Sequence, residues 1–245
     1  MGNNLIDQAV FLCLLRGKVV VALGVLLDLF QRLAGVLAEH PVHLIADIDH
    51  VLGMDLDIRG LAGKAAALLA ETGSAQRSDC LLDRACFQKL RQLAEESRCV
   101  YLQTYVRTMI DAANLRALVR AERMHMDPGF LQEVLFEGGS VTPDAIRAGA
   151  SEPAALFRST ALREAAELGE AAVKGGSLTD FEKACDNAVL RTAAGARRVP
   201  FGVEVALGYL IAKEAEWTAV RIVMAGRLAG LSADAIRERL RDTYV

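Results

Sequence analysis

The chain has 245 residues, which is enough to bury a hydrophobic core in one large domain or in two of ordinary size. Apolar residues make up 53% and charged residues 24%, with 28 Lys and Arg against 31 Asp and Glu; a formal net charge of -3 argues against a nucleic-acid-binding protein. A 5% aromatic share and five prolines, beside many Ala, Leu, Arg and Glu residues, favour helices and argue against an all-β fold.

Cysteine usage and the first apolar stretch bear on the cellular compartment. The five cysteines are odd in number and form no Cys-x-x-Cys pair, a pattern typical of reduced thiols in the cytosol. Arg16 and Lys18 lie within the apolar stretch near the start. A signal peptide instead carries its positive charges before its apolar residues, so this stretch does not have the pattern of a signal peptide. The longest clean apolar run covers residues 19–27 and stops at Asp28, short of the ~20 residues that span a bilayer. We therefore expect a cytoplasmic chain without a transmembrane span.

Apolar residues recur at intervals of three and four along most of the chain, which is the spacing of one helix face. Asp127 before Pro128 and Thr142 before Pro143 are N-cap signals with proline at the first helical position. No segment alternates apolar and polar residues as a half-buried strand would. The sequence therefore predicts an all-α fold, with helices over residues 26–39, 41–53, 58–69, 81–93, 99–123, 128–138, from 143 on, 153–174, 178–194, 200–227 and 233–244.

The predicted helix over residues 200–227 has apolar residues round most of its circumference, which is typical of a buried central helix. Within it, Glu216 and Arg221 lie too far apart round the helix to pair, whereas Glu214 and Arg221 lie two turns apart on one face. Buried charges need partners. These side chains therefore either join a network between helices or point to solvent through gaps in the apolar surface, and the sequence leaves both open.

Two stretches of the chain match each other in order. Residues 141–147 (VTPDAIR) match residues 231–237 (LSADAIR), and in each the residue before the cap is placed to pack on the first turn as a hydrophobic staple. Upstream of each lies a long apolar helix that carries an acidic residue and then an Arg, which are Asp111 and Arg116 in one helix and Glu216 and Arg221 in the other. Further upstream, residues 82–85 parallel residues 185–188. We predict two helical repeats related by pseudo-symmetry, residues 39–140 and 141–245, with apolar helices over residues 1–38 unassigned. As a hypothesis, a polar seam or socket is lined by Asp111, Arg116, Glu214, Glu216 and Arg221.

The sharpest enzyme-like signal lies on the predicted helix over residues 41–53. His43, Asp47 and His50 stand at i, i+4 and i+7, so one helix face would offer three metal ligands. A solvated helix face with Asp beside His is the favoured alternative, because short motif matches are often fortuitous. If these residues were ligands, the purified protein would hold about one Zn, Mn or Fe per chain and would lose stability when the metal is stripped.

Other signals for catalysis are weak. The sequence contains no Walker phosphate loop, no Gly-x-Gly-x-x-Gly motif and no Gly-x-Ser-x-Gly nucleophile elbow. Gly138 and Gly139 follow a predicted helix, where glycine commonly ends helices, so a phosphate cradle is the less favoured interpretation there. We therefore expect no catalytic residues, no cofactor and no bound metal.

Several segments carry a family resemblance. They are residues 207–216 (LGYLIAKEAE), 219–221 (AVR), 230–232 (GLS) and 236–240 (IRERL), with 81–84 (LLDR), 110–120 (IDAANLRALVR) and the Gly138-Gly139 step upstream. In this order they resemble the C subunit of the archaeal and bacterial V-type ATP synthases, which is equivalent to the d subunit of vacuolar proton pumps. The resemblance covers residues 80–245, is weak over residues 41–79 and is absent before residue 39.

The resemblance implies an all-helical, funnel-like, non-catalytic protein with three similar repeats. It implies that the protein seats the central rotor shaft on the proteolipid ring, at the cytoplasmic face of the membrane, in a complex for ATP synthesis or for proton or sodium transport. This chain shows two such repeats, so the first is missing or reduced to residues 1–38. Two other functions stay open, a metal-dependent helical enzyme using His43, Asp47 and His50, and a helical-repeat adaptor unrelated to rotary ATPases.

Overall fold

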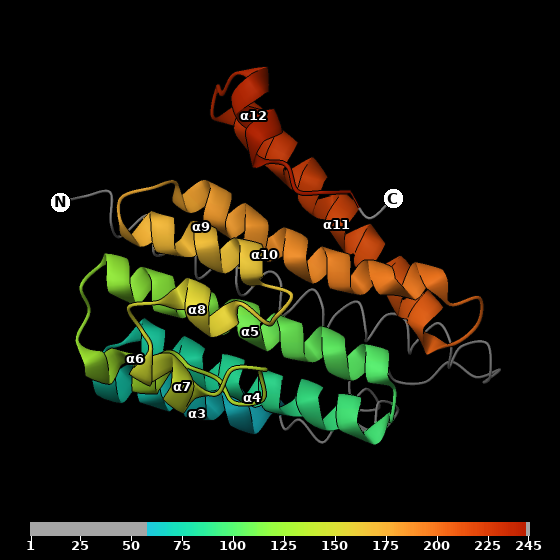
Figure 1. Cartoon of the computed structure of the whole chain (residues 1–245). Coiled ribbons are helices and arrows are strands. Elements are labelled where there is room, and N and C mark those ends of the chain that lie inside the picture. The colour runs from blue at the N-terminus through green and yellow to red at the C-terminus, as the bar shows by residue number, and fades with distance from the viewer. Residues whose placement is uncertain (1–57, 244–245) are drawn as a thin grey trace. The chain divides into compact units, whose positions relative to one another are not determined.

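The computed structural model describes residues 58–243, and these residues form helices joined by short loops (Figure 1). No strand occurs within this range, so the all-α prediction is confirmed. The predicted helices over residues 26–39 and 41–53 and the unassigned segment 1–38 lie outside the described residues. The elements are α3 (Ile58–Thr72), α4 (Ala75–Glu96), α5 (Val100–Arg123), α6 (Pro128–Val134), α7 (Pro143–Ala148), α8 (Pro153–Phe157), α9 (Arg163–Val173), α10 (Leu178–Ala193), the 3₁₀ helix η1 (Ala194–Arg198), α11 (Val203–Leu228) and α12 (Ala233–Arg239).

The chain separates into two compact units, residues 1–86 and 87–245. In the first unit, α3 and the start of α4 are tied together by the Ser78 hydroxyl, which donates to the Ala65 carbonyl at 2.9 Å. The second unit contains α5 to α12 and nearly all the candidate site residues. The two repeats over residues 39–140 and 141–245 were inferred from matching sequence segments, and they stay a prediction.

Helix α5 lies at the centre of the second unit. Helices α9 and α10 pack along it (Figure 1), and its side chains Ile110, Leu115, Leu118 and Val119 have essentially no exposed surface. Gly169 allows α9 to approach α5 closely, because a Cβ there would stand 2.7 Å from Val119 Cγ2. The surrounding core is closed by other fully buried side chains, Ile146, Phe157, Leu162 and Phe181.

The two matching cap segments fold alike. The Thr142 hydroxyl accepts from the Ala145 N–H at 3.3 Å at the start of α7, and the Ser232 hydroxyl accepts from the Ala235 N–H at 3.2 Å at the start of α12. These bonds satisfy an N–H group that has no partner within the helix. The N-cap predicted at Thr142 is therefore confirmed, and Ser232 makes the same bond in the matching segment. The N-cap predicted at Asp127 is also confirmed, because its carboxylate accepts from the Gly129 N–H at 3.0 Å.

Several predicted helices are shorter in the structure, among them the one expected over residues 128–138, which ends at Val134 as α6. The helix expected over residues 153–174 is divided into α8 and α9, because the Thr160 hydroxyl donates to the Phe157 carbonyl at 2.8 Å and accepts from the Leu162 N–H at 3.1 Å, closing a local turn. The helix expected over residues 233–244 ends at Arg239. The chain then turns back, and Arg241 and Asp242 bind α10 instead of continuing the helix.

Candidate functional site

Asp111 lies in the middle of α5 and is almost wholly buried. Its Oδ1 atom accepts hydrogen bonds from the backbone N–H groups of Ser140 at 2.7 Å and Val141 at 3.2 Å, in the loop before α7. Burial raises the pKa of Asp111 above its ordinary value of 3.8, although the bonds from Ser140 and Val141 and the charge of Arg107 act in the opposite direction. Asp111 therefore anchors this loop to the central helix.

The same contact explains the two glycines before Ser140. Gly138 has φ of 102°, in the left-handed region that favours glycine, and a Cβ on Gly139 would stand 2.2 Å from Asp111 Oδ1. The N–H groups of Ser140 and Val141 donate to a carboxylate of the same chain. The glycine step thus lets the loop approach Asp111 closely, which accounts for it without a phosphate ligand.

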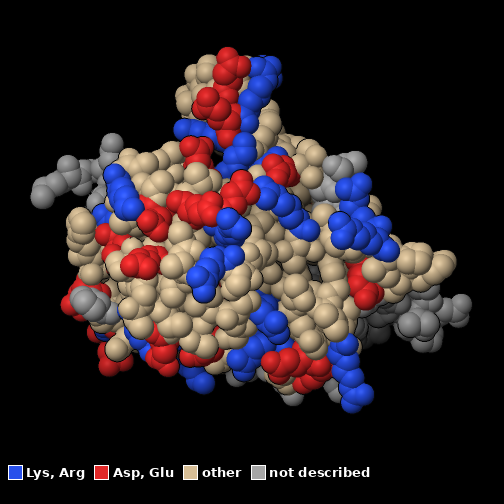
Figure 2. Space-filling view, viewed as in Figure 1, with Lys and Arg blue, Asp and Glu red and all other residues tan. Residues whose placement is uncertain are grey.

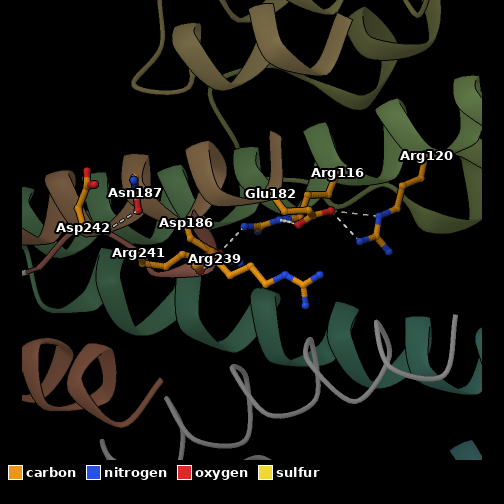
Figure 3. A network of polar contacts seen from close by, with 8 residues as sticks. All are labelled: Arg116, Arg120, Glu182, Asp186, Asn187, Arg239, Arg241 and Asp242. Atoms are coloured by element: carbon orange, nitrogen blue, oxygen red, sulfur yellow. Dashed lines mark hydrogen bonds and ion pairs between the residues drawn. The ribbon is translucent and has the colours of Figure 1, made fainter. Parts of the chain in front are cut away.

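Arg116, one and a half turns after Asp111, joins a network of charged groups between α5 and α10 (Figure 3). Its Nε donates to Glu182 Oε2 at 2.8 Å, and its second guanidinium nitrogen donates to Asp186 Oδ1 at 2.5 Å. Arg120, one turn further along α5, bonds Glu182 Oε1 at 2.6 Å. Two arginines spaced i, i+4 on α5 therefore face two acids spaced i, i+4 on α10.

The network keeps its charges although it is mostly buried. Arg116 is only 8% exposed, and burial disfavours its charged form, yet the carboxylates of Asp186 and Glu182 hold its pKa above the ordinary value. Burial lowers the pKa of Arg120, and the charge of Glu182 opposes that change. No buried side-chain nitrogen or oxygen of the described residues lacks a hydrogen-bond partner. Arg116 therefore has the partners that a buried charge requires.

The segment after α12 completes the network (Figure 3). Arg241 Nε donates to Asp186 Oδ2 at 2.7 Å, so Asp186 bridges two arginines from distant parts of the sequence. The Asp242 N–H donates to Asn187 Oδ1 at 2.9 Å. These bonds hold the segment that follows α12 against α10.

The hypothesis of a polar seam names residues that the structure finds in separate places. Asp111 bonds the loop before α7, whereas Arg116 bonds α10, so these two residues share neither a bond nor a partner. Sequence reasoning did not single out Glu182, Arg120 or Arg241 as parts of the network. The signal that could have found them is the matched i, i+4 spacing, two arginines on one predicted helix and two acids on another.

Helix α11 differs from the buried central helix that its composition predicts, and that prediction is wrong. Glu216 is exposed and bonds Lys213 within the same helix at 2.8 Å, and Arg221 is also exposed. Glu214 is half-buried on the side toward α5, where burial and then the Glu214 carboxylate raise the pKa of Tyr105. One side of α11 therefore packs within the chain and the other faces solvent.

The solvent-facing side of α11 carries large apolar side chains. Tyr209 is 61% exposed and Trp217 is 68% exposed. Large apolar side chains that gather on the exposed side of one helix often mark an interaction site. We name the α11 face as the exposed large apolar residues on and just before this helix, Phe201, Val205, Tyr209, Trp217, Val220, Met224 and Leu228.

The charged surface gives no sign of a polyanion-binding patch on the view in Figure 2. Lys and Arg side chains are interspersed there with Asp and Glu side chains, including around α12. Such a mixed surface fits protein contacts better than contacts with a phosphate backbone.

Metal-binding and membrane-spanning features are both lacking from residues 58–243. Within that range no cluster of His, Cys, Asp and Glu side chains is arranged to hold a metal ion. No helix of the described part is both long and apolar enough to cross a membrane. His43, Asp47 and His50 lie outside the described residues, so the metal site stays a hypothesis for them.

Comparison with known proteins identifies the family. The family model described as ATP synthase (C/AC39) subunit matches residues 13–239, which is most of the chain. The chain belongs to this family. The resemblance to the C subunit of V-type ATP synthases is thereby confirmed, and the matched region includes α3 to α12.

A curated relative of this C/AC39 chain is the C subunit of the V-type sodium ATPase of Enterococcus hirae. It is 25% identical over 172 residues, which are 69% of this chain and 52% of the relative. The chain thus matches about half the length of that relative. No solved structure matches the chain.

Proposed function

We propose that this chain is a non-catalytic subunit of a rotary V-type ATPase or ATP synthase, and that it couples the central rotor shaft to the membrane proteolipid ring in proton or sodium transport. The observation that carries the proposal is the family match over residues 13–239. A member of this family acts through its surfaces, at the cytoplasmic face of the membrane and without a membrane span of its own.

The buried network suits a part that transmits force. Torque passes through a protein without loss only if its helices keep their places, and Arg116 and Asp186 join α5, α10 and the segment after α12 by short bonds. Charged groups with several bonds and little exposure resist rearrangement more than exposed pairs do. We assign Asp111 and Arg116 to this internal role.

The polar contacts to the shaft are assigned to α11 in this proposal. Glu216 and Arg221 are exposed there, and Glu214 is half-buried beside them. Polar contacts of this kind allow reversible docking, since interfaces between separable partners are less apolar than permanent ones. Binding of the shaft is therefore expected to weaken as salt is raised.

A binding assay with the two shaft subunits at low and high salt tests the proposal. We expect association that weakens with salt, and no ATP hydrolysis by the chain alone. Glu216→Ala and Arg221→Ala should weaken it further, whereas Glu167→Ala, which removes an exposed acid paired with Arg163 on α9, should leave it unchanged. A folded chain that binds the shaft subunits at neither salt concentration would instead favour a helical adaptor unrelated to rotary ATPases.

A further inference from the structure

A pocket of about 520 Å³ lies where the end of α4 and the start of α5 meet the loop before α7. Its walls are mostly polar: Arg91 and Glu95 come from α4, Gln103 and Arg107 from α5, and Ser140 from the loop. All of these residues belong to the second compact unit. The volume lies within the range of roughly 300–1,000 Å³ that is usual for small-molecule sites, so the pocket has room for an organic ligand.

Arg107 gives the pocket a positive charge that no ion pair neutralises. Its side chain is exposed and forms no ion pair with any residue between 58 and 243. Its charge lowers the pKa of Asp111, but that carboxylate is bonded to the N–H groups of Ser140 and Val141. A guanidinium has five N–H donors and no acceptor, so Arg107 is suited to an anionic ligand with several oxygens.

Arg91 adds a second positive charge, and it lies against the loop. A Cβ on Gly138 would stand 2.7 Å from Arg91 Cδ and 3.3 Å from its Nη1, so the arginine lies over the backbone at this glycine. Arg91 Nε is 3.5 Å from Glu95 Oε1, and the two side chains are 45% and 65% exposed. Because such an exposed pair contributes little to stability, a ligand with more charge can replace Glu95 as the partner of Arg91.

The loop supplies donors of another kind. The N–H groups of Ser140 and Val141 donate to Asp111, whereas those of Gly138 and Gly139 bond no acceptor among the residues that the structure describes. The contact with Asp111 therefore explains why glycines stand here, but it leaves two N–H groups for a ligand or for water. Successive backbone N–H groups form anion-binding sites in many proteins.

We propose that this pocket binds the phosphate group of a small polar phosphate ester, with Arg107 and Arg91 as its main contacts and the loop N–H groups beside them. The donors come from two helices and a loop, so they approach a ligand from several directions. A phosphate offers three terminal oxygens to such donors, whereas a carboxylate offers two oxygens in one plane. None of the described residues that line the pocket is aromatic, so a nucleotide base has no ring to stack on and a glycerol or sugar phosphate fits better.

Calorimetric titration of the full chain with glycerol 3-phosphate, at fixed ionic strength, tests the proposal. We expect saturable binding at one site per chain, with acetate binding at least about ten-fold more weakly. Arg107→Ala and Arg91→Ala should each weaken binding of the phosphate ester by about ten-fold or more, because each removes hydrogen bonds to a charged group. Arg163→Ala is the matched control, since it removes an exposed arginine of α9 outside the pocket, and it should bind like the original chain. Circular dichroism checks that all three variants are folded.

Glu95 allows a test in the opposite direction. Glu95→Gln removes the acid that competes for Arg91, so it should strengthen binding of glycerol 3-phosphate about two- to five-fold. Glu96→Gln removes the neighbouring acid, which bonds Gln92 and does not line the pocket, and it should change the affinity less. Weaker binding by Glu95→Gln would contradict the assignment of an anionic ligand.

Vesicles distinguish the two sources of such a phosphate. Flotation compares vesicles of phosphatidylcholine with vesicles that also contain phosphatidic acid. Binding of free glycerol 3-phosphate without retention on either kind of vesicle identifies a soluble phosphate ester as the ligand. Retention on phosphatidic acid that Arg107→Ala abolishes identifies a lipid headgroup. Both outcomes support the phosphate site.

The site is independent of the proposed function, because binding is measured on the chain without any other subunit. The inference would be overturned by a folded chain that binds neither glycerol 3-phosphate nor vesicles with phosphatidic acid, or that binds acetate equally well. Binding that is unchanged in both Arg107→Ala and Arg91→Ala would also overturn it. None of these outcomes bears on binding of the shaft.

Discussion

Helices α5 and α11 carry the same series of side chains in opposite surroundings. Each is long, and each has an acid followed by an aliphatic-Arg pair: Asp111, Leu115 and Arg116 in α5, and Glu216, Val220 and Arg221 in α11. In α5 all three members are buried, whereas in α11 all three are exposed. The residue pattern alone therefore does not decide whether a charge sits in a network or in solvent.

The difference follows from what covers each helix. Helix α5 is packed by α9, α10, α6 and α8, so its acid and its arginine must find partners inside the protein. Helix α11 contacts η1, α10 and α12, which leaves one side open to water. A charge on that side needs no partner, and an apolar residue there is available for another chain.

The largest expected difference between the two helices is at the arginines. Arg116→Ala removes the guanidinium that both Glu182 and Asp186 bond, so it should lower the free energy of unfolding by about 3 to 5 kcal/mol. Arg221→Ala removes an exposed side chain and should change it by less than about 0.5 kcal/mol. Urea unfolding of both variants at one protein concentration measures the contrast. Equal effects would show that the two arginines have equivalent surroundings.

The acids should differ next most strongly. Asp111→Ala leaves the N–H groups of Ser140 and Val141 without their acceptor and should cost about 1 to 3 kcal/mol, whereas Glu216→Ala should cost less than about 0.5 kcal/mol. Thermal unfolding checks both values. A loss at Glu216 as large as that at Asp111 would contradict the assignment of Glu216 to the surface.

The raised pKa of Asp111 makes its contribution to stability depend on pH. Since the native state holds this proton more tightly than the unfolded state, the contribution is fully present below the unfolded pKa and is lost as the pH rises through the native pKa. Asp111→Asn keeps an oxygen acceptor and removes the titration. The variant should therefore gain stability relative to the original chain as the pH rises above about 4, measured by urea unfolding. A difference that does not change with pH would contradict the raised pKa.

The smallest expected effects are at the two helix caps, and here the two regions should agree. Thr142→Ala and Ser232→Ala each remove one hydroxyl acceptor at the start of a short helix and should each cost about 1 kcal/mol. Thr142→Ser should restore most of the loss at the first site. Thermal unfolding measures both losses of stability. Clearly unequal losses would mean that the two segments share the geometry of the cap bond but not its contribution to stability.

Helix positions and caps could be predicted from the sequence because they depend on residues close together in the chain. The spacing of apolar residues identified the all-α fold, and the Thr142 and Ser232 caps act on N–H groups three residues away. Some predicted helices were too long, as at residues 158–162 and after Arg239, because the spacing of apolar residues carries no information about polar bonds. At the first place the Thr160 hydroxyl closes a turn, and at the second Arg241 bonds α10.

Short-range patterns in the sequence predict most of the helices, reveal the family resemblance and place Asp111 and Arg116 on a long apolar helix. The bonds from Arg116 to Glu182 and Asp186, which lie 66 and 70 residues further along, and the exposure of Glu216 and Arg221 depend on how helices distant in the sequence pack. The physical reason is that burial is a property of the elements packed on a side chain. A helix with apolar residues on every side requires covering on every side, and its own sequence does not say whether the cover comes from the same chain or from another.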